Sequence, residues 1–176
     1  MTDAPPFSRP VRVDALPAGG LAQTIEADEA ERAALARLDG LPAIASLNAN
    51  FTVRRSGRGG VRVTGDVHAE VTQVCVVSLE PFAATVDEPV DVRYAPAEPP
   101  ASRRDADEGE TVDFDDEDPP DPIVDGKIDL GALAAEFFAL GLDPYPRKPG
   151  VAFDAPAPED GGDTPFADLE KLNKKP

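Results

Sequence analysis

The chain has 176 residues, of which 41% are hydrophobic, and this is enough to form the core of one domain. Its formal net charge of −17 disfavours long-range attraction to a bare polyanion such as RNA and favours a basic partner. It has no apolar run of about 18 residues, no secretory signal at its start and a single cysteine, so we expect a cytoplasmic protein without a membrane span or an internal disulfide.

The N-terminal part of the chain is expected to form two short strands and a helix. The strands lie near Phe7–Val13 and Leu21–Ile25. A helix running to about Leu38 follows, because Asp28 can cap its first turn and Glu31 can reach back to the cap amide. The residues of this helix expected to face the core are Ala34, Leu35 and Leu38.

From Ala45 onwards hydrophobic residues alternate with polar ones, which is typical of half-buried strands. Three such strands joined in sequence indicate an antiparallel meander. The residues expected on its inner face are Ala45, Leu47, Ala49, Phe51, Val53, Val61, Val63, Val67, Ala69, Val71, Phe82, Ala84, Val86, Val90, Val92 and Tyr94.

Three positions are expected to interrupt this alternation. Gly65 is expected to mark a bulge. Pro89 is expected to mark a bulge or an edge strand, because proline cannot donate to a ladder. The run Val74–Val77 is continuously apolar, so we expect this end of the second strand to be covered on both faces.

Residues 95–125 are predicted to form a flexible acidic loop within a single domain spanning residues 1–176. Eleven acidic residues and no lysine or arginine lie between Asp105 and Asp125, and few residues of the segment could enter a core. Such charge blocks are usually solvated or bind partners, so the segment either keeps the protein soluble or engages a basic protein. The candidate contacts for a basic partner are Asp113, Asp115, Asp116, Glu117 and Asp118.

A second helix is predicted after Asp129, which can cap it, and Pro144 ends it. Residues 147–176 are expected to form an extended tail with a short terminal helix at Pro165–Leu172. The fold class is therefore α+β, an antiparallel β-meander packed by two main helices, with a long acidic loop and an extended C-terminal tail. The residues of the second helix expected to face the sheet are Leu130, Leu133, Ala134, Phe137 and Leu140.

No catalytic, cofactor or metal site is predicted. His68 falls on the polar face of a strand, where a solvated histidine is the simpler interpretation. Cys75 has no second cysteine and no local histidine, so neither a zinc site nor a Cys–His nucleophile is indicated, and we expect a buried, inert thiol. The acidic segment lacks the spacing of a calcium loop, and no phosphate-binding loop is present.

One basic cluster falls on the hairpin between the first two strands of the meander, where no acid lies between Phe51 and Thr64. Arginine suits bidentate contact with phosphate, so this cluster is a candidate RNA contact. Basic hairpin tips also keep proteins soluble and discourage edge pairing, and this alternative stays open. The members of the cluster are Arg54, Arg55, Arg58 and Arg62.

Four segments, in order, resemble the signature of the YceD family: Val71–Phe82, Gly126–Leu130, Leu140–Pro146 and Pro165–Leu172. Many members of that family have a second cysteine three residues after the first, whereas this chain has Ser78, which argues against a metal or redox role here. The positions that carry the resemblance are Cys75, Leu79, Pro81, Asp129, Leu130, Pro146 and Phe166.

This resemblance implies a non-enzymatic role in the accumulation of large-subunit (23S) ribosomal RNA through ribosome assembly. The partner would be the large-subunit rRNA precursor or a basic ribosomal protein, with no membrane and no small-molecule substrate. An alternative function is a chaperone-like binder of one basic ribosomal protein that never contacts RNA. No catalytic residue follows from the resemblance.

Overall fold

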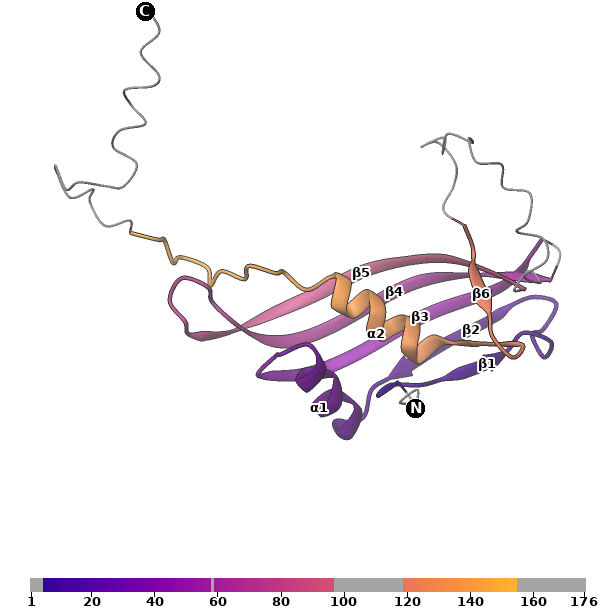
Figure 1. Ribbon diagram of the computed structural model, residues 1–176, viewed down its shortest axis with the longest axis horizontal. Helices are drawn as coiled ribbons and strands as arrows, with labels where there is room; N and C mark the ends of the chain where they lie inside the picture. The colour runs from indigo at the N-terminus through magenta and orange to yellow at the C-terminus, as the bar shows by residue number, and fades with distance from the viewer. Residues whose placement is uncertain (1–4, 58, 97–118, 155–176) are drawn as a thin grey trace, which may run out of the picture.

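The computed structural model describes residues 5–57, 59–96 and 119–154 and consists of a twisted sheet with two helices and a two-stranded ribbon (Figure 1). The sheet has the order β2-β3-β4-β5-β6, in which β2 to β5 are antiparallel and β6 is parallel to β5. The helices are α1 (Glu29–Leu38) and α2 (Leu130–Leu140), and the ribbon pairs β1 (Pro10–Arg12) with β7 (Lys127–Asp129). The strands of the sheet are β2 (Leu21–Glu26), β3 (Ala43–Ser56), β4 (Gly60–Val74), β5 (Pro81–Pro96) and β6 (Asp121–Ile123).

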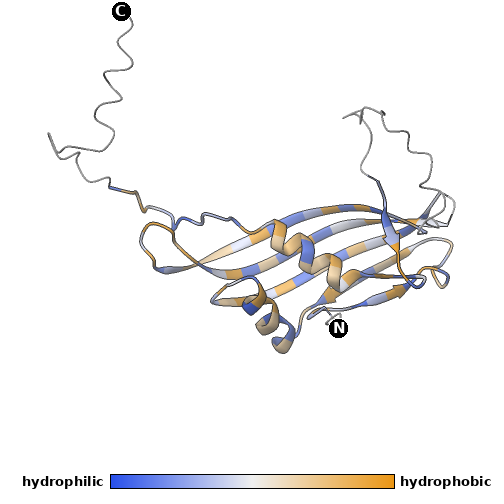
Figure 2. Cartoon of the chain, in the orientation of Figure 1, coloured by the Kyte–Doolittle hydropathy of each residue, from blue (hydrophilic) through white to orange (hydrophobic). Residues whose placement is uncertain are grey.

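The predicted meander is confirmed as β3, β4 and β5. Hydrophobic and hydrophilic residues alternate along these strands (Figure 2), and buried and exposed residues alternate with them. We call the apolar side the inner face and the opposite side the outer face. Most inner-face residues of β3 and β4 are at most 2% exposed, as the period of two predicts. Apart from Gly60 at the hairpin, no described residue on the outer face of β2 to β5 is buried, so this face of the sheet is largely polar.

Helix α2 and the β1–β7 ribbon cover the inner face (Figure 1). Phe7, Ile128 and Phe138 are buried there among the strand valines. Because a sheet face and a helix stripe must each be covered, this packing forms the core. Helix α1 instead contacts β3 near the point where β2 ends.

Both helix caps are confirmed, but two of the predicted core leucines are exposed. Leu38 and Leu140 are each 71% exposed, so both assignments are wrong. In α1 the buried residues are Leu35 and Ala36, and Leu38 on the last turn lies beyond this narrow contact with β3. In α2 the buried stripe continues through Phe138 to Gly141, which closely approaches Val86 and Glu88 of β5. Leu140 therefore lies off the stripe.

The bulge lies at a different place from the one predicted. Pairing between β3 and β4 shifts at Ile44–Ser46, which turns Ile44 inward and leaves Ala45 exposed. At Gly65, where the bulge was expected, the register is regular. A Cβ atom at this position would overlap the backbone carbonyl oxygen of Asn50, so the glycine reflects close approach of two strands.

The end of β4 is not covered on both faces, contrary to the prediction from its apolar run. The strand ends at Val74, where the chain turns. Val74 and Val76 are 41% and 44% exposed, and within the run Val74–Val77 only Cys75 is fully buried. Pro89 pairs with Asp66 without a shift in register. The predicted edge position of Pro89 is thus confirmed for the part of the chain described, since β6 pairs only with Tyr94–Pro96.

The last residues of the predicted acidic loop form a strand. Residues Asp121–Ile123 are β6, and they pair in parallel with the end of β5. Residues 97–118, which include the five candidate acidic contacts, lie outside the described residues, as do Arg58, Phe166 and the predicted terminal helix.

Replacement of Gly65 by alanine is expected to destabilise the sheet. An alanine in a strand normally favours folding over glycine, but here its Cβ would meet backbone rather than a movable side chain. We expect Gly65→Ala to lower the free energy of unfolding by about 1–3 kcal/mol in urea denaturation. Gly19→Ala is the control, because an alanine there meets nothing within 4 Å. Equal stability of the two variants would contradict the close approach.

Candidate functional site

The arginine end of the sheet is built by the pairing register of three strands. Arg54 of β3 lies opposite Arg62 of β4, and Arg62 lies opposite Arg93 of β5, so the three form a row on the outer face. Arg93 was missed by the sequence reasoning because it comes from the following strand. Two things were needed to place Arg93 beside the hairpin. The alternation of β5 had to be extended to the end of that strand, and the register between β4 and β5 had to be known.

Two arginines of the predicted cluster are already held by the fold. Arg62 donates from Nε and Nη2 to the two carboxylate oxygens of Asp91, at 2.7 and 2.5 Å. The hydrogen bond from Arg62 is the main reason why the pKa of Asp91 lies below its ordinary value. Arg55 points away from this row, and its Nη2 donates to the carbonyl oxygens of Asp14 and Leu16 at 3.2 and 3.0 Å.

Arg54 differs from Arg55 and Arg62 in its hydrogen bonds and ion pairs. It makes no hydrogen bond or ion pair with any of the residues described, and it is exposed. Arg54, Arg55 and Arg62 are all exposed, but Arg55 does not share a face with the other two. The predicted cluster thus does not form one basic patch.

The rest of the outer face is polar and acidic. His68 Nδ1 lies 2.6 Å from Asp87 Oδ1, which gives the half-buried histidine a carboxylate partner. Asn50 accepts from Thr24 at 2.8 Å and donates to Asp66 at 3.1 Å, so a chain of hydrogen bonds crosses three strands. The outer face therefore carries carboxylates along its length and arginines at one end.

The turn between β4 and β5 holds the cysteine. Cys75 is fully buried, as predicted, and its sulfur accepts a hydrogen bond from the amide of Ser78 at 3.4 Å. Its amide donates to the carbonyl oxygen of Glu80, and its own carbonyl accepts from Leu79, at 2.9 Å each. Leu79 adopts a φ of 59°, a conformation that glycine usually takes, and is 76% exposed.

The segment after α2 returns to this turn and closes it. The amide of Val76 donates to the carbonyl oxygen of Pro146 at 2.9 Å, and Lys148 forms a 2.8 Å ion pair with Glu80. The Ser78 hydroxyl and amide, with the Lys148 amide, lower the pKa of Cys75 to about 6 against the opposing effect of desolvation. Positions far apart in the sequence, Cys75 and Pro146 among them, therefore form one closed structure.

Asp129 joins the N-terminus of α2 to the start of the chain. Its carboxylate caps the helix through the amides of Gly131 and Ala132, at 3.0 and 3.2 Å. It also accepts from the amide of Arg9 at 2.7 Å and the hydroxyl of Ser8 at 2.5 Å. Burial would raise its pKa, but these hydrogen bonds outweigh burial and the pKa lies below its ordinary value.

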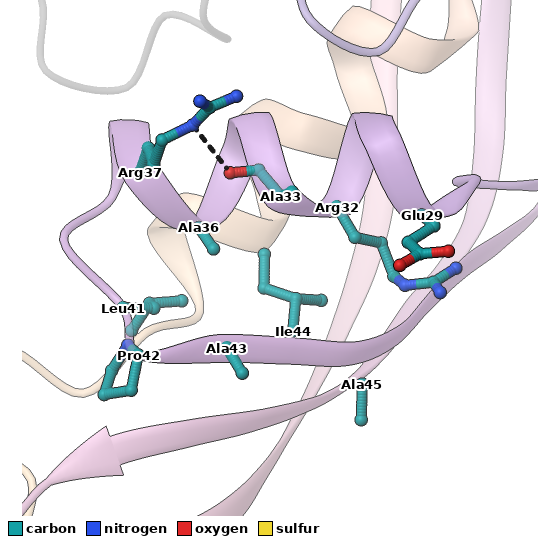
Figure 3. A pocket seen from close by; sticks show the side chains of 10 residues that line it. All are labelled: Glu29, Arg32, Ala33, Ala36, Arg37, Leu41, Pro42, Ala43, Ile44 and Ala45. Carbon is teal, nitrogen blue, oxygen red and sulfur yellow. Dashed lines mark hydrogen bonds between the residues drawn. The ribbon is translucent and has the colours of Figure 1, made fainter.

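A hollow among the described residues lies between α1 and the start of β3 (Figure 3). It has a volume of about 570 Å³, an apolar floor and two arginines at its rim, Arg32 and Arg37. Arg37 donates to the Ala33 carbonyl oxygen at 3.1 Å, and Glu29 is the single carboxylate among the described residues that line the hollow. This lining offers no acid–base pair.

The described residues also hold no group of three or more His, Cys, Asp or Glu arranged to bind a metal ion. None of the helices in the described chain is long and apolar enough to span a membrane.

Comparison with protein families identifies the chain. Residues 63–175, well over half of the sequence, match the family model described as large ribosomal RNA subunit accumulation protein YceD. The chain belongs to the YceD family. The match starts in β4 and covers all four segments that carried the resemblance in the sequence. No curated protein and no solved structure matches this YceD-family chain.

Loss of the Asp129 carboxylate is expected to destabilise the protein strongly. Asp129→Ala removes a helix cap and leaves Ser8 and Arg9 without their acceptor, so we expect a loss of about 2–3 kcal/mol in chemical denaturation. Because the folded pKa lies below the unfolded value of about 3.9, the stabilisation is complete above that pH and disappears as the pH falls through the folded value. The stability gap between wild type and Asp129→Asn should therefore close below about pH 4. Asp154→Ala, at an exposed carboxylate, should show no such gap.

Native Cys75 is expected to react with iodoacetamide far more slowly than the unfolded chain. The thiolate is the reactive form, and a pKa of about 6 ionises most of it at neutral pH, so slow reaction would reflect shielding alone. Cys75→Ala combined with Val76→Cys moves the thiol to a position that is 44% exposed, and this variant should react rapidly. Equally fast labelling of the native wild type, measured by mass spectrometry, would contradict the burial of Cys75.

Proposed function

We propose that this YceD-family protein is a non-enzymatic factor that promotes accumulation of 23S ribosomal RNA by binding the large-subunit precursor during assembly in the cytoplasm. The match of residues 63–175 to the family described as large ribosomal RNA subunit accumulation protein is the observation that carries the proposal. It involves neither a membrane nor a small-molecule substrate.

The chemistry of the described residues supports binding rather than catalysis. The carboxylates with the clearest pKa shifts, Asp129, Glu31 and Asp91, each accept hydrogen bonds that join separate elements. Glu31 receives two bonds from Arg9 at 2.7 and 2.9 Å and completes the capping box of α1. Structural bonds of this kind account for the shifts without a reaction, so we propose that none of these groups is a catalyst.

A basic protein is the partner that the charges favour, and this supports the second candidate, a chaperone-like binder of one basic ribosomal protein. The chain carries −17, which repels RNA at long range and attracts a basic surface. Arg62 is neutralised by Asp91, and Arg55 is bound to backbone carbonyl oxygens. Phosphate contact would have to displace these bonds.

Affinity purification from cells, before and after nuclease treatment, tests the proposal. The expected result is recovery of large-subunit precursor particles, and of a basic ribosomal protein that remains bound after nuclease. Loss of every ribosomal component in both samples would contradict a role in assembly. Loss of the basic ribosomal protein after nuclease treatment would contradict the chaperone-like candidate and favour direct RNA contact.

Two matched variants are expected to separate the modes of contact. Deletion of residues 105–121 should weaken sedimentation with precursor particles, whereas Arg54→Gln with Arg58→Gln should leave it nearly unchanged. Arg55 and Arg62 are left intact because both make structural bonds. Loss of Arg62 would leave Asp91 without this hydrogen-bond donor, and loss of Arg55 would remove a hydrogen bond to the Leu16 carbonyl oxygen.

If arginines held phosphate instead, each lost contact would lower the slope of log affinity against log salt by about 0.9, taking duplex DNA as the guide. Arg37→Gln, an exposed arginine on α1, is the control. Loss of sedimentation in the arginine variant with none in the deletion would reverse the preference for a protein partner.

A further inference from the structure

We propose that the open edge of β5 docks an extended basic segment of a partner protein, which adds to the sheet as a further strand. The inference rests on the proposed function, because it names how a basic partner would be held. It depends on three features of the described chain. The backbone along one edge of β5 is unpaired, carboxylates lie beside that edge, and β6 already pairs with the far end of β5.

The backbone of β5 is paired on one side only along most of its length. On the β4 side its register is continuous from Pro81 opposite Val74 to Tyr94 opposite Val61. On the other side β6 pairs only with Tyr94–Pro96. Within the part of the chain that the structure describes, residues 81–91 therefore form an open edge.

The groups that point outward can be assigned from the neighbouring bonds. The Glu80 carbonyl oxygen accepts from Cys75, and the Tyr94 carbonyl oxygen lies beside Gly60 of β4. Even-numbered residues of β5 thus bond with β4, and odd-numbered residues direct their amides and carbonyls to the open edge. Pro81 and Pro89 are both odd-numbered, so neither deprives the β4 ladder of a donor. Between Pro81 and Asp91 the outward amides are those of Ala83, Thr85, Asp87 and Asp91.

The charge along this edge is negative. Asp87 lies on its outer-face side and Glu88 on its inner-face side, while Asp91 is already neutralised by Arg62. Towards β6, Asp121 lies opposite Tyr94 and adds a carboxylate at the far end of the edge. Unpaired backbone groups beside Glu88 and the His68-bonded Asp87 suit a strand that carries lysine or arginine.

The inner-face side of the edge favours apolar residues in the added strand. Helix α2 ends over β5, where an ideal Cβ at Gly141 would lie 2.6 Å from Val86 Cγ1. The adjacent Leu140 is 71% exposed. An added strand alternates its side chains between the two faces, so basic residues on the outer side would meet Asp87, and apolar residues would meet Val86 and Leu140.

The edge accepts a basic strand more readily than a second copy of this chain. Strand β6 shows that the edge pairs with an added strand, in parallel, at Tyr94–Pro96. A second copy would bring its own Asp87 and Glu88 to the same place, and like charges facing each other are unfavourable. Charges and proline on an edge strand are also the usual protection against self-pairing.

Amide hydrogen exchange of the full-length protein with a synthetic peptide tests the proposal. The probe is an eight-residue peptide of alternating lysine and valine with blocked ends, and the control replaces each lysine by glutamate. At a concentration ten times its Kd, the lysine peptide should slow exchange at the amides of Thr85 and Asp87 by about tenfold, since only the free form exchanges there. The glutamate peptide should have no effect.

Thr85→Pro is the decisive variant, because it removes an outward amide without touching the bonds to β4. It should abolish binding of the lysine peptide, while Thr85→Val, which keeps the amide, should bind like wild type. If Thr85→Pro has a lower denaturation midpoint, Asp87→Asn with Glu88→Gln is used instead and should weaken binding and its dependence on salt.

Several outcomes would overturn the proposal: full exchange protection of Thr85 and Asp87 in the free protein, binding of the lysine peptide without protection of this edge, equal binding by Thr85→Pro and Thr85→Val, or pairing of the edge with a second copy. The assay contains no ribosomal component, so its failure leaves the role in rRNA accumulation intact. Success with the peptide, combined with particle association that Thr85→Pro does not change, would instead count against the edge as the site used in assembly.

Discussion

One carboxylate, that of Asp129, connects the parts of the molecule that cover the sheet. It accepts bonds from the start of α2 and from Ser8 and Arg9 at the beginning of the chain. Arg9 then reaches Glu31 in the first turn of α1, and Glu31 caps that helix. The two helices are thus coupled through a short chain of charged hydrogen bonds, each stronger than a neutral one. This chain of bonds links both helices to the start of the polypeptide.

The family positions are explained by structure before any partner is considered. Leu130 and Asp129 set the start of α2, and Pro146 bonds to the turn that buries Cys75. The turn keeps Leu79 in an unusual backbone conformation and exposes its side chain, although neither feature contributes to packing within the described chain. The motif therefore specifies a closed corner at one end of the sheet, far along β4 and β5 from the arginine row.

Features governed by neighbouring residues could be predicted from the sequence. The caps at Asp28 and Asp129, the alternation of β3 to β5 and the burial of Cys75 all depend on short-range patterns. Periodicity shows which residues share a face, but not where the opposing element stops, so Leu38 and Leu140 were misplaced.

The pairing register of the strands could not be predicted from the sequence either. It moves Ala45 outward at the bulge and brings Arg93 beside Arg62, and neither follows from local sequence. The bonds from Arg55 to Asp14 and Leu16 depend on long-range packing in the same way.

The parallel pairing of β6 has a consequence for how this protein can vary. Tyr94 lies opposite Asp121, so the chain departs from β5 and rejoins the sheet on neighbouring strands. The closure entropy of an insertion between two such fixed points grows slowly, by about 0.6 kcal/mol for each doubling of its length. Length and acidity between Pro96 and Asp121 can therefore change by mutation almost independently of folding. The domain would keep its core while its net charge changes.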